Sequence, residues 1–317
     1  MRVPGLLPRD HWVRHVETLD PIVDYEEISR ITGHHEFPWD LQQALSFALF
    51  RTYAVPSIGS LLHRTDEFTG STQKRHDDTV IVLETVLDDG MENPDGRAAI
   101  RRMNQMHGSY DISNDDMLYV LCTFVVAPVR WIDELGWRRL TETELRAAVE
   151  YYRRLGRLMG IRGIPDDYAG FERHMDRYEA AHFAFDPGSR AVADATLDLF
   201  TTFYPRPLRP AMRTFAIALL DDHLRRAFDY PTPPRWVQRA ARRAIRARSQ
   251  VVRLLPPRRR PYDPRRSHRI RSYPGGFMVE RLGTFPSGSR SDDVTAPIVE
   301  RPPRPGRDLR PAGRLRE

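Results

Sequence analysis

Apolar residues recur three and four positions apart along most of the chain between residues 39 and 230. This spacing places them on one side of an α-helix, so that each segment can bury an apolar stripe against its neighbours. The sequence contains no strand-like alternation of β-branched and polar residues and no internal repeat. The pattern therefore predicts an all-α domain.

Proline, glycine and capping residues divide this region into separate predicted helices. Pro128 is expected to end or kink a strongly apolar helix, and Thr141 with Glu144 matches a capping box for the next one. Helices are predicted to begin at Pro38 and after Pro56, and to cover about 72–89, 94–110, 114–127, 142–160, 167–184, 189–203, 211–228 and 235–255.

Composition divides the chain into three parts. Residues 1–38 show no clear period, residues 39–230 hold the predicted helical domain, and residues 231–317 form a tail rich in Arg and Pro. From Arg235 onward there are 22 Arg and 7 Asp or Glu, a charge of +15, whereas the preceding residues carry −9. The acidic body and the basic C-terminal extension are therefore expected to have different partners.

Several features point to a cytoplasmic protein. The longest apolar run, near residues 118–129, is too short to span a bilayer, and the first residues lack the apolar core of a signal peptide. A single cysteine, Cys122, excludes an internal disulfide and any metal site made of several cysteines. We predict a cytoplasmic location, with peripheral membrane contact as a further expectation.

One histidine lies on an apolar helix face. Ile100, Met103 and His107 are spaced by three and four residues, so they share one side of the helix predicted at 94–110. A buried imidazole needs a partner, and two interpretations stay open. His107 either donates to a backbone carbonyl within the core, or it is a metal ligand, such as the axial ligand of haem iron.

A second polar cluster lies on the helix predicted at 72–89. Arg75, Asp78 and Thr79 share a face that continues as Val82 and Val86, which indicates that this face turns inward. An Arg–Asp pair on a helix is usually a surface ion pair of little consequence. The alternative interpretation is a ligand pocket, since a few polar groups next to apolar residues are typical of such sites. Elsewhere, His34 and His35 are expected at the surface.

Four motifs resemble those of the MpaB-type oxygenase and rubber oxygenase (latex-clearing protein) catalytic-domain family: KRHDDT, AIRRMNQMHGSYDISNDDMLYVLCTFVVAPVRW, GWRRLTETE and GRLMGIRGIP. The resemblance covers about residues 40–225. It implies a globin-related helical bundle around a haem b pocket, and some members cleave isoprenoid double bonds with dioxygen. It also implies that His107 is the proximal iron ligand and that Arg75 and Thr79 form the polar pair on the distal side.

Two positions depart from the polymer-cleaving members. Asp78 stands where they carry a lysine, and Asn104 stands where they carry an arginine. If that arginine helps to hold the haem, Arg101 or Arg102 would have to replace it here. Asp78 could act as a general base if burial raised its pKa, or it could simply neutralise Arg75.

Three hypotheses follow for the helical domain. The first is a haem b-dependent oxygenase that uses dioxygen on an apolar, isoprenoid or lipid-like small molecule. The second is a non-catalytic protein that binds haem or another apolar ligand, favoured by the departures at Asp78 and Asn104. The third is a helical module without a cofactor.

The basic tail has three candidate partners. Residues 235–255 could lie on an anionic membrane as an amphipathic helix, with Trp236, Val237 and Ile245 in the interface. The tail could also fold back on the acidic body. Nucleic acid is disfavoured because aromatic residues that stack on bases are sparse there. Residues after Leu255 are expected to be disordered.

Overall fold

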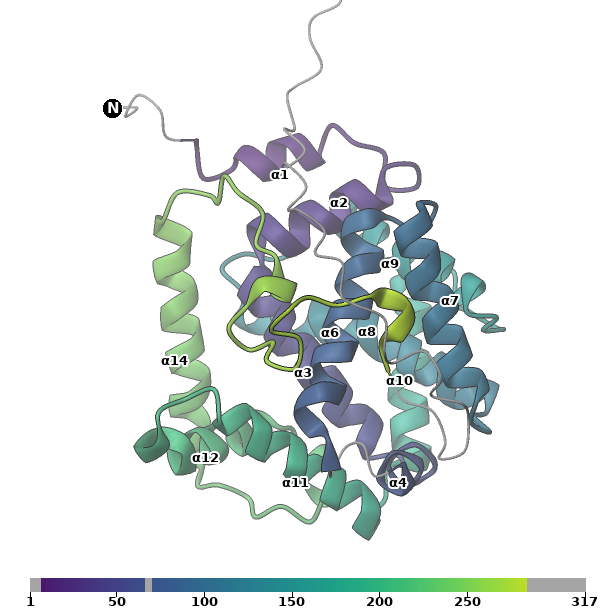
Figure 1. The fold of residues 1–317 in the computed structure, drawn as a ribbon. Helices are drawn as coiled ribbons and strands as arrows, with labels where there is room; N and C mark the ends of the chain where they lie inside the picture. Colours follow the sequence, from purple (N-terminus) through teal and green to yellow (C-terminus); the bar gives the residue numbers. More distant parts are fainter. Residues whose placement is uncertain (1–6, 66–69, 284–317) are drawn as a thin grey trace, which may run out of the picture.

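The computed structural model describes residues 7–65 and 70–283 (Figure 1). Within these residues the chain forms helices and turns and no strand, so the all-α prediction is confirmed. The helices are α1 (His11–Val16), α2 (Tyr25–Ile31), η1 (Thr32–Glu36), α3 (Pro38–Tyr53), α4 (Pro56–Arg64), α6 (Thr72–Asp89), α7 (Pro94–Gly108), α8 (Asn114–Leu135), α9 (Glu142–Leu158), α10 (Tyr168–His182), α11 (Pro187–Thr201), η2 (Arg206–Leu208), α12 (Arg209–Leu219), α13 (Asp222–Ala227), α14 (Arg235–Leu254), η3 (Pro264–Arg266) and η4 (Val279–Arg281).

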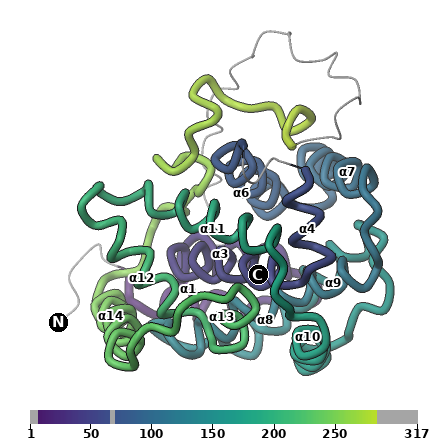
Figure 2. The backbone as a smooth tube through the Cα atoms, turned by 90° about the horizontal axis from the view of Figure 1, so that it is seen from below, coloured from purple at the N-terminus to yellow at the C-terminus, as the bar shows by residue number. Residues whose placement is uncertain are grey.

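Helix α3 runs through the middle of the molecule. Figure 2 shows α11, α4 and α8 around it, and α3 packs most extensively against the long helix α8. Helices α6 and α7 pack against each other, α10 packs on α8, and α9 packs on α2. The cavity described below lies where the α6–α7 pair meets this central group.

Helix starts follow the capping residues seen in the sequence. Ser113 accepts a hydrogen bond from the Asp116 backbone N–H at 3.0 Å. Thr141 and Glu144 form the reciprocal capping box, with distances of 3.2 and 2.8 Å. Each cap satisfies a backbone N–H group that the first helical turn leaves without a partner. The predicted bounds of α6 agree with the structure: the helix begins directly after Ser71, whose side chain makes no capping hydrogen bond, and it ends just before Gly90, which has a positive φ.

Two predicted helices differ from the observed ones. Helix α8 does not end at Pro128 but continues to Leu135, because apolar residues on both sides of Pro128 are buried. The helix predicted over 211–228 is divided into α12 and α13. Asp221 caps α13 by accepting from the Leu224 backbone N–H at 2.8 Å, which starts a new helix there.

His34 and His35 are buried, so their predicted surface location is wrong. Each ring forms a hydrogen bond with a residue that is distant along the chain. His34 Nε2 lies 2.9 Å from a carboxylate oxygen of Glu84 on α6, and His35 Nδ1 lies 3.0 Å from the carbonyl oxygen of Arg258. These long-range partners satisfy the imidazoles inside the domain.

The tail packs on the helical domain as far as residue 283. The Trp12 indole N–H donates to the Arg258 carbonyl at 2.8 Å, and the Tyr262 backbone N–H donates to the His34 carbonyl at 3.0 Å. The disorder predicted after Leu255 is therefore not observed for residues 256–283. The rest of that prediction, residues 284–317, lies outside the described residues.

The predicted helix over 235–255 is present as α14, but its inner side belongs to the domain core. Ile245 is 4% exposed, and Arg248 forms an ion pair of 2.9 Å with Asp40 on α3. The prediction that Ile245 faces a membrane is therefore wrong, because this residue packs inward. Trp236, by contrast, is 71% exposed.

No single helix in residues 7–65 or 70–283 is long and apolar enough to cross a membrane. Helices α3 and α4 reach the required length and composition only as a pair, and the chain bends by 95° between them. Half of α3 is turned toward the core, where Ala44, Ala48, Phe50 and Tyr53 are buried.

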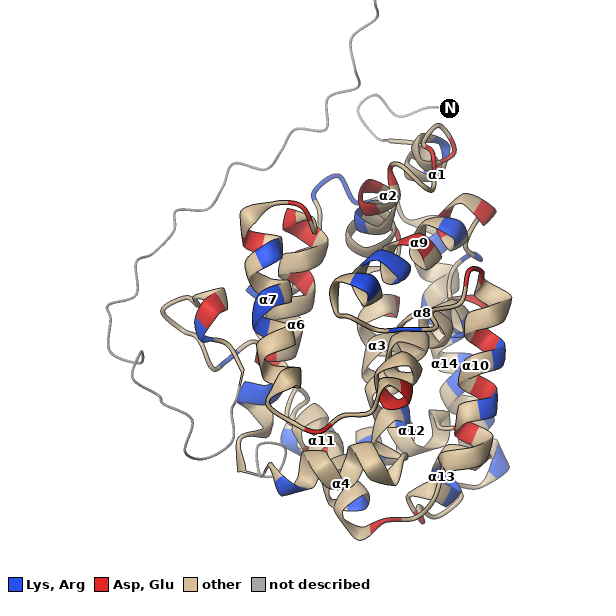
Figure 3. Cartoon of the chain, turned by 90° about the vertical axis from the view of Figure 1, so that its right-hand side faces the viewer, with Lys and Arg blue, Asp and Glu red and all other residues tan. Residues whose placement is uncertain are grey.

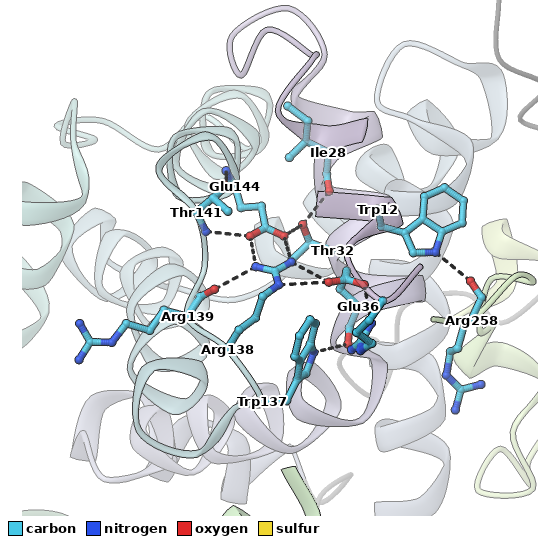
Figure 4. Close-up of polar contacts among 11 residues, drawn as sticks. Trp12, Ile28, Thr32, Glu36, Trp137, Arg138, Arg139, Thr141, Glu144 and Arg258 are labelled. Carbon is cyan, nitrogen blue, oxygen red and sulfur yellow. Dashed lines mark hydrogen bonds and ion pairs between the residues drawn. The ribbon is translucent and has the colours of Figure 1, made fainter. Parts of the chain in front are cut away.

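A buried ionic cluster joins η1 to the start of α9 (Figure 4). The Arg138 guanidinium lies between two carboxylates, 2.8 Å from Glu36 and 2.5 Å from Glu144. Arg9 contacts Glu36 from the other side at 3.1 Å, and the Thr32 hydroxyl donates to Glu144 at 3.2 Å. Both glutamate side chains are fully enclosed, so their charge depends on these donors.

We expect Arg138→Met to lower the free energy of unfolding by about 3–5 kcal/mol, because it leaves two buried carboxylates short of a counter-charge. Urea unfolding measures the change. Arg139→Met is the matched control, since Arg139 is exposed and its removal should shift stability by less than about 0.5 kcal/mol. Equal unfolding midpoints for the two variants would show that the cluster contributes no net stability.

Candidate functional site

A cavity of about 280 Å³ lies between α3, α4, α6, α7, α8, α9 and α11. Figure 3 shows charged residues along α7 and α10, whereas α3 and α4 carry few. The cavity walls are mainly apolar, and such a lining with a few polar groups is typical of small-molecule sites. The apolar walls include Leu49, Ile58, Leu61, Val82, Leu83, Met103, Met106, Val120, Leu121, Phe124, Leu155 and Leu199.

Helix α7 brings His107 to this cavity beside Met103 and Met106. The Nδ1 atom is buried and has no hydrogen-bond partner among the described residues. Burial, and then the positive charge of Arg75, lower the pKa of His107 to about 4. The ring is therefore neutral at pH 7, with a nitrogen that the protein itself does not satisfy. A core histidine bound through Nδ1 to a backbone carbonyl is not what the structure has.

Helix α6 brings Arg75 and Thr79 to the same cavity. The Arg75 guanidinium donates to the Thr79 hydroxyl oxygen at 3.1 Å, and this hydroxyl donates to the Arg75 carbonyl at 2.9 Å. Arg75 and His107 line the same cavity, and the positive charge of Arg75 contributes to the lowered pKa of His107. The structure thus brings together three of the residues that the sequence singled out.

Tyr53 is a further polar residue of the cavity that the sequence did not reveal. It lies at the end of α3, hydrogen-bonded to Thr196 on α11 and close to the charge of Arg75. Burial raises the pKa of Tyr53 to about 12, so its hydroxyl keeps its proton at neutral pH. In the sequence Tyr53 follows the apolar stripe of α3 and has no feature that separates it from a core aromatic residue.

Asp78 borders the cavity but pairs with Lys74 rather than with Arg75. Its Oδ2 lies 2.7 Å from the Lys74 ammonium and accepts the Gly283 backbone N–H at 3.0 Å. The Tyr273 hydroxyl donates to Oδ1. The prediction that Asp78 neutralises Arg75 is therefore wrong. The charge of Asp78 is balanced by Lys74, one helical turn earlier, and is stabilised by hydrogen bonds from Tyr273 and Gly283 in the tail.

Arg101 and Arg102 do not belong to the described residues that line the cavity. Arg101 is exposed, and Arg102 donates through Nε to the Leu282 carbonyl at 2.6 Å. Asn104 donates to the Leu158 carbonyl at 2.9 Å. The placement of these residues gives no support to the expectation that either arginine holds a haem propionate.

His107 also borders a second cavity of about 410 Å³. Tyr110, Met117 and Met159 line both cavities, and Arg162 lines the second one. The imidazole therefore lies where two hollows meet. No group of three or more His, Cys, Asp or Glu side chains within residues 7–65 and 70–283 is placed to hold a metal ion.

Residues 41–253 match the family described as ER-bound oxygenase mpaB/B'/Rubber oxygenase, catalytic domain. The ER-bound oxygenase mpaB' of Penicillium brevicompactum is 30% identical over 264 residues, which cover 77% of this chain and 62% of the relative. The ER-bound oxygenase mpaB of Penicillium roqueforti is 28% identical over 234 residues, covering 68% of this chain and 78% of the relative.

The ER-bound oxygenase mpaB of P. brevicompactum is 31% identical over 240 residues, covering 69% of this chain and 61% of the relative. The matches thus span about three fifths of the length of the two P. brevicompactum proteins. The family match includes α3 through α11, which contribute the cavity walls, and nearly all of α14. The chain therefore belongs to the ER-bound oxygenase mpaB/B' and rubber oxygenase catalytic-domain family.

Proposed function

We propose that this protein is a haem b-dependent oxygenase that uses dioxygen to oxidise an apolar, isoprenoid or lipid-like substrate in the cavity. One observation carries the proposal: a neutral, half-buried imidazole borders an apolar cavity, and its buried Nδ1 atom has no hydrogen-bond partner among the described residues. Family membership supports oxygen chemistry.

The residues present fit a haem held by one axial ligand. Imidazole binds iron in its neutral form, and the lowered pKa keeps His107 in that form. Met103, Met106 and Leu155 offer apolar contacts of the kind that a porphyrin ring requires. When bound, haem iron would supply the binding and activation of dioxygen.

The polar residues of the cavity would support that chemistry. Arg75 can donate hydrogen bonds to negative charge that develops on dioxygen, and in an apolar cavity such a donor acts strongly. Thr79 would act by positioning Arg75, because its own hydroxyl hydrogen is donated to the Arg75 carbonyl. The Arg75–Thr79 hydrogen bond holds the guanidinium in place. Tyr53 keeps its proton and can donate as well. The apolar walls would exclude water and hold a hydrocarbon chain.

The alternative function is binding of haem or another apolar ligand without oxidation. The contacts of Asp78 favour this alternative, because they occupy a carboxylate for which a general-base role was one of two open interpretations. Product analysis under dioxygen with isoprenoid and lipid substrates separates the two functions. A haem-loaded protein that yields no oxidised product from any of them would support the alternative.

We expect His107→Ala to lose most of its haem while keeping its helical content, because the variant removes the axial nitrogen but leaves the apolar walls. The Soret absorbance per protein, after growth with haem supplements, measures occupancy, and circular dichroism measures helicity. His182→Ala is the control, since His182 is exposed on α10. Equal Soret absorbance in His107→Ala and wild type would exclude His107 as the iron ligand.

We expect Arg75→Met to raise the pKa of His107 in the haem-free protein, because a nearby positive charge now disfavours protonation. NMR titration of the imidazole should give about 4 in the wild type and a higher value in the variant. Arg97→Met, on the exposed side of α7, should leave the titration unchanged.

The same Arg75→Met variant, loaded with haem and reduced, should be oxidised in air at a different rate from the wild type. If neither the titration nor this rate changes, Arg75 does not face the reaction site.

A peripheral membrane contact also belongs to the proposal. The relatives are named ER-bound, and one side of α14 exposes apolar and basic residues together. Trp236, Val251 and Leu254 are 71%, 58% and 86% exposed, with Arg239 and Arg243 exposed on the same helix. This face, rather than the Ile245 face, could lie on an anionic bilayer, where each basic residue contributes about 1 kcal/mol.

Figure 1 places α14 on the opposite side of the molecule from α7. The contact would thus anchor the protein without placing the His107 cavity on the lipid. The predicted cytoplasmic location and the predicted lack of nucleic-acid binding stay predictions.

We expect the full chain to sediment with anionic phosphatidylserine vesicles at low salt, and Trp236→Ala/Leu254→Ser to sediment several-fold less. These substitutions remove interfacial anchors but leave the packed side of α14 intact, unlike deletion of the whole helix. Val23→Ser is the control, since Val23 is 72% exposed on another part of the surface. Equal sedimentation of the double variant and the control would exclude α14 as the contact.

A further inference from the structure

Residues 270–283, named here the C-terminal strap, cross from α6 to α7. Figures 1 and 2 both show this part of the chain beside these two helices, with η4 near its end. Helix α6 carries Arg75 and Thr79, and α7 carries His107. The strap therefore joins the two helices that bear the polar residues of the cavity.

The apolar side of the strap is part of the domain core. Leu282 is fully buried in the cluster that contains Val82 and Met103, two residues that also line the cavity. Ile270, Tyr273, Phe277 and Val279 pack against the same cluster. Leu282 thus belongs to the same hydrophobic cluster as two residues of the cavity wall.

Two neighbouring aspartates of α6 hold the polar side of the strap. Asp77 Oδ2 accepts the backbone N–H groups of Arg271 and Ser272, each at 2.9 Å. Although burial alone would raise the pKa of Asp77, hydrogen bonds from His76 and from these backbone groups lower it.

Asp78 accepts hydrogen bonds from both ends of the strap. The Tyr273 hydroxyl donates to its Oδ1, and the Gly283 backbone N–H donates to its Oδ2 at 3.0 Å. Asp78 is 1% exposed, so these partners and Lys74 take the place of water around the carboxylate. A carboxylate satisfied in this way is poorly placed to accept a proton from a substrate.

The end of the strap fits closely against α7. Arg102 donates to the Leu282 carbonyl at 2.6 Å. Gly283 has a φ of +84°, and a Cβ atom at this position would lie 1.7 Å from the sulfur of Met106, which lines the cavity. A side chain at position 283 would therefore be strained and would displace Met106.

We propose that the C-terminal strap is part of the oxygenase site: it closes the wall between α6 and α7, and Asp78 is its anchor, a positioning residue and not a general base. By linking the two helices, the strap fixes the separation between the Arg75–Thr79 pair and His107. That this wall belongs to an oxygenase site rests on the proposed function. The contacts of Asp78 with the strap are independent of the proposed function.

Hydrogen–deuterium exchange of the full-length, haem-free protein tests the anchor. Asp78→Asn replaces one acceptor oxygen with an amide N–H₂ group, which faces the donors that now bind the carboxylate. Tyr273→Phe removes one of these donors, the Tyr273 hydroxyl, and keeps the ring. We expect amides of residues 270–283 to exchange about tenfold faster in both variants. His268→Ala, an exposed position just before the strap, is the control and should match the wild type. Unchanged exchange in both variants overturns the proposal.

Product formation by the haem-loaded variants separates an anchor from a general base. If Asp78 is an anchor, Asp78→Asn and Tyr273→Phe lower turnover in parallel with the loosening of the strap. If Asp78 is the base, Asp78→Asn abolishes turnover with the strap still protected and Tyr273→Phe stays near wild type, which overturns the proposal. If the protein binds no haem, the proposed function fails, and the exchange data still decide whether the strap is anchored.

A glycine pair tests the contact with α7. Both glycines have positive φ, so alanine strains the backbone at either position. Gly283→Ala should speed exchange in the strap more than Gly276→Ala, because the new methyl group at position 283 meets Met106, whereas Gly276 is exposed. Adding Met106→Ala to Gly283→Ala should restore part of the protection by making room for the new methyl group. Equal exchange in the two single variants would show that the strap does not seat against Met106.

Discussion

The positions of two cavity walls depend on the ion pairs of the partly buried Arg138 with two enclosed glutamates. Its guanidinium binds Glu36, directly before α3, and Glu144, in the first turn of α9. Helix α3 ends in Tyr53, and α9 carries Tyr152 and Leu155, all of which line the cavity. Because both carboxylates are enclosed, neither helix start can shift without exposing a buried charge to an apolar surrounding.

The cavity brings a cation, Arg75, close to a neutral imidazole, His107. Arg75 and His107 lie close enough for the cation to disfavour a second positive charge, and burial acts in the same direction. The imidazole can therefore stay unprotonated although no carboxylate is paired with it in the described structure. An arrangement of this kind keeps the imidazole neutral and the guanidinium charged at the same pH, because burial and the nearby positive charge both disfavour protonation of His107.

The sequence was informative where structure depends on neighbours in the chain. Local sequence signals predicted the bounds of α6 and the position of His107 on the same helix face as Ile100 and Met103, because both follow from residues within a few turns. The partners of Asp78, His34 and His35 could not be predicted, since they come from Tyr273, Gly283, Glu84 and Arg258, distant along the chain. For the same reason, the tail looked disordered: its order depends on acceptors such as Asp77 that only the fold places beside it.

The strap also gives a physical reason for the departure at position 78. The family match ends at residue 253, before the strap begins, although the strap contacts α6 and α7 within the matched region. The polymer-cleaving proteins that the chain resembles carry a lysine at position 78. An ammonium there could not accept the Gly283 N–H or the Tyr273 hydroxyl proton, and it would repel Lys74 one turn away. A carboxylate at position 78 can accept both of these hydrogen bonds, so the contacts with the strap give a structural reason for an acidic residue here.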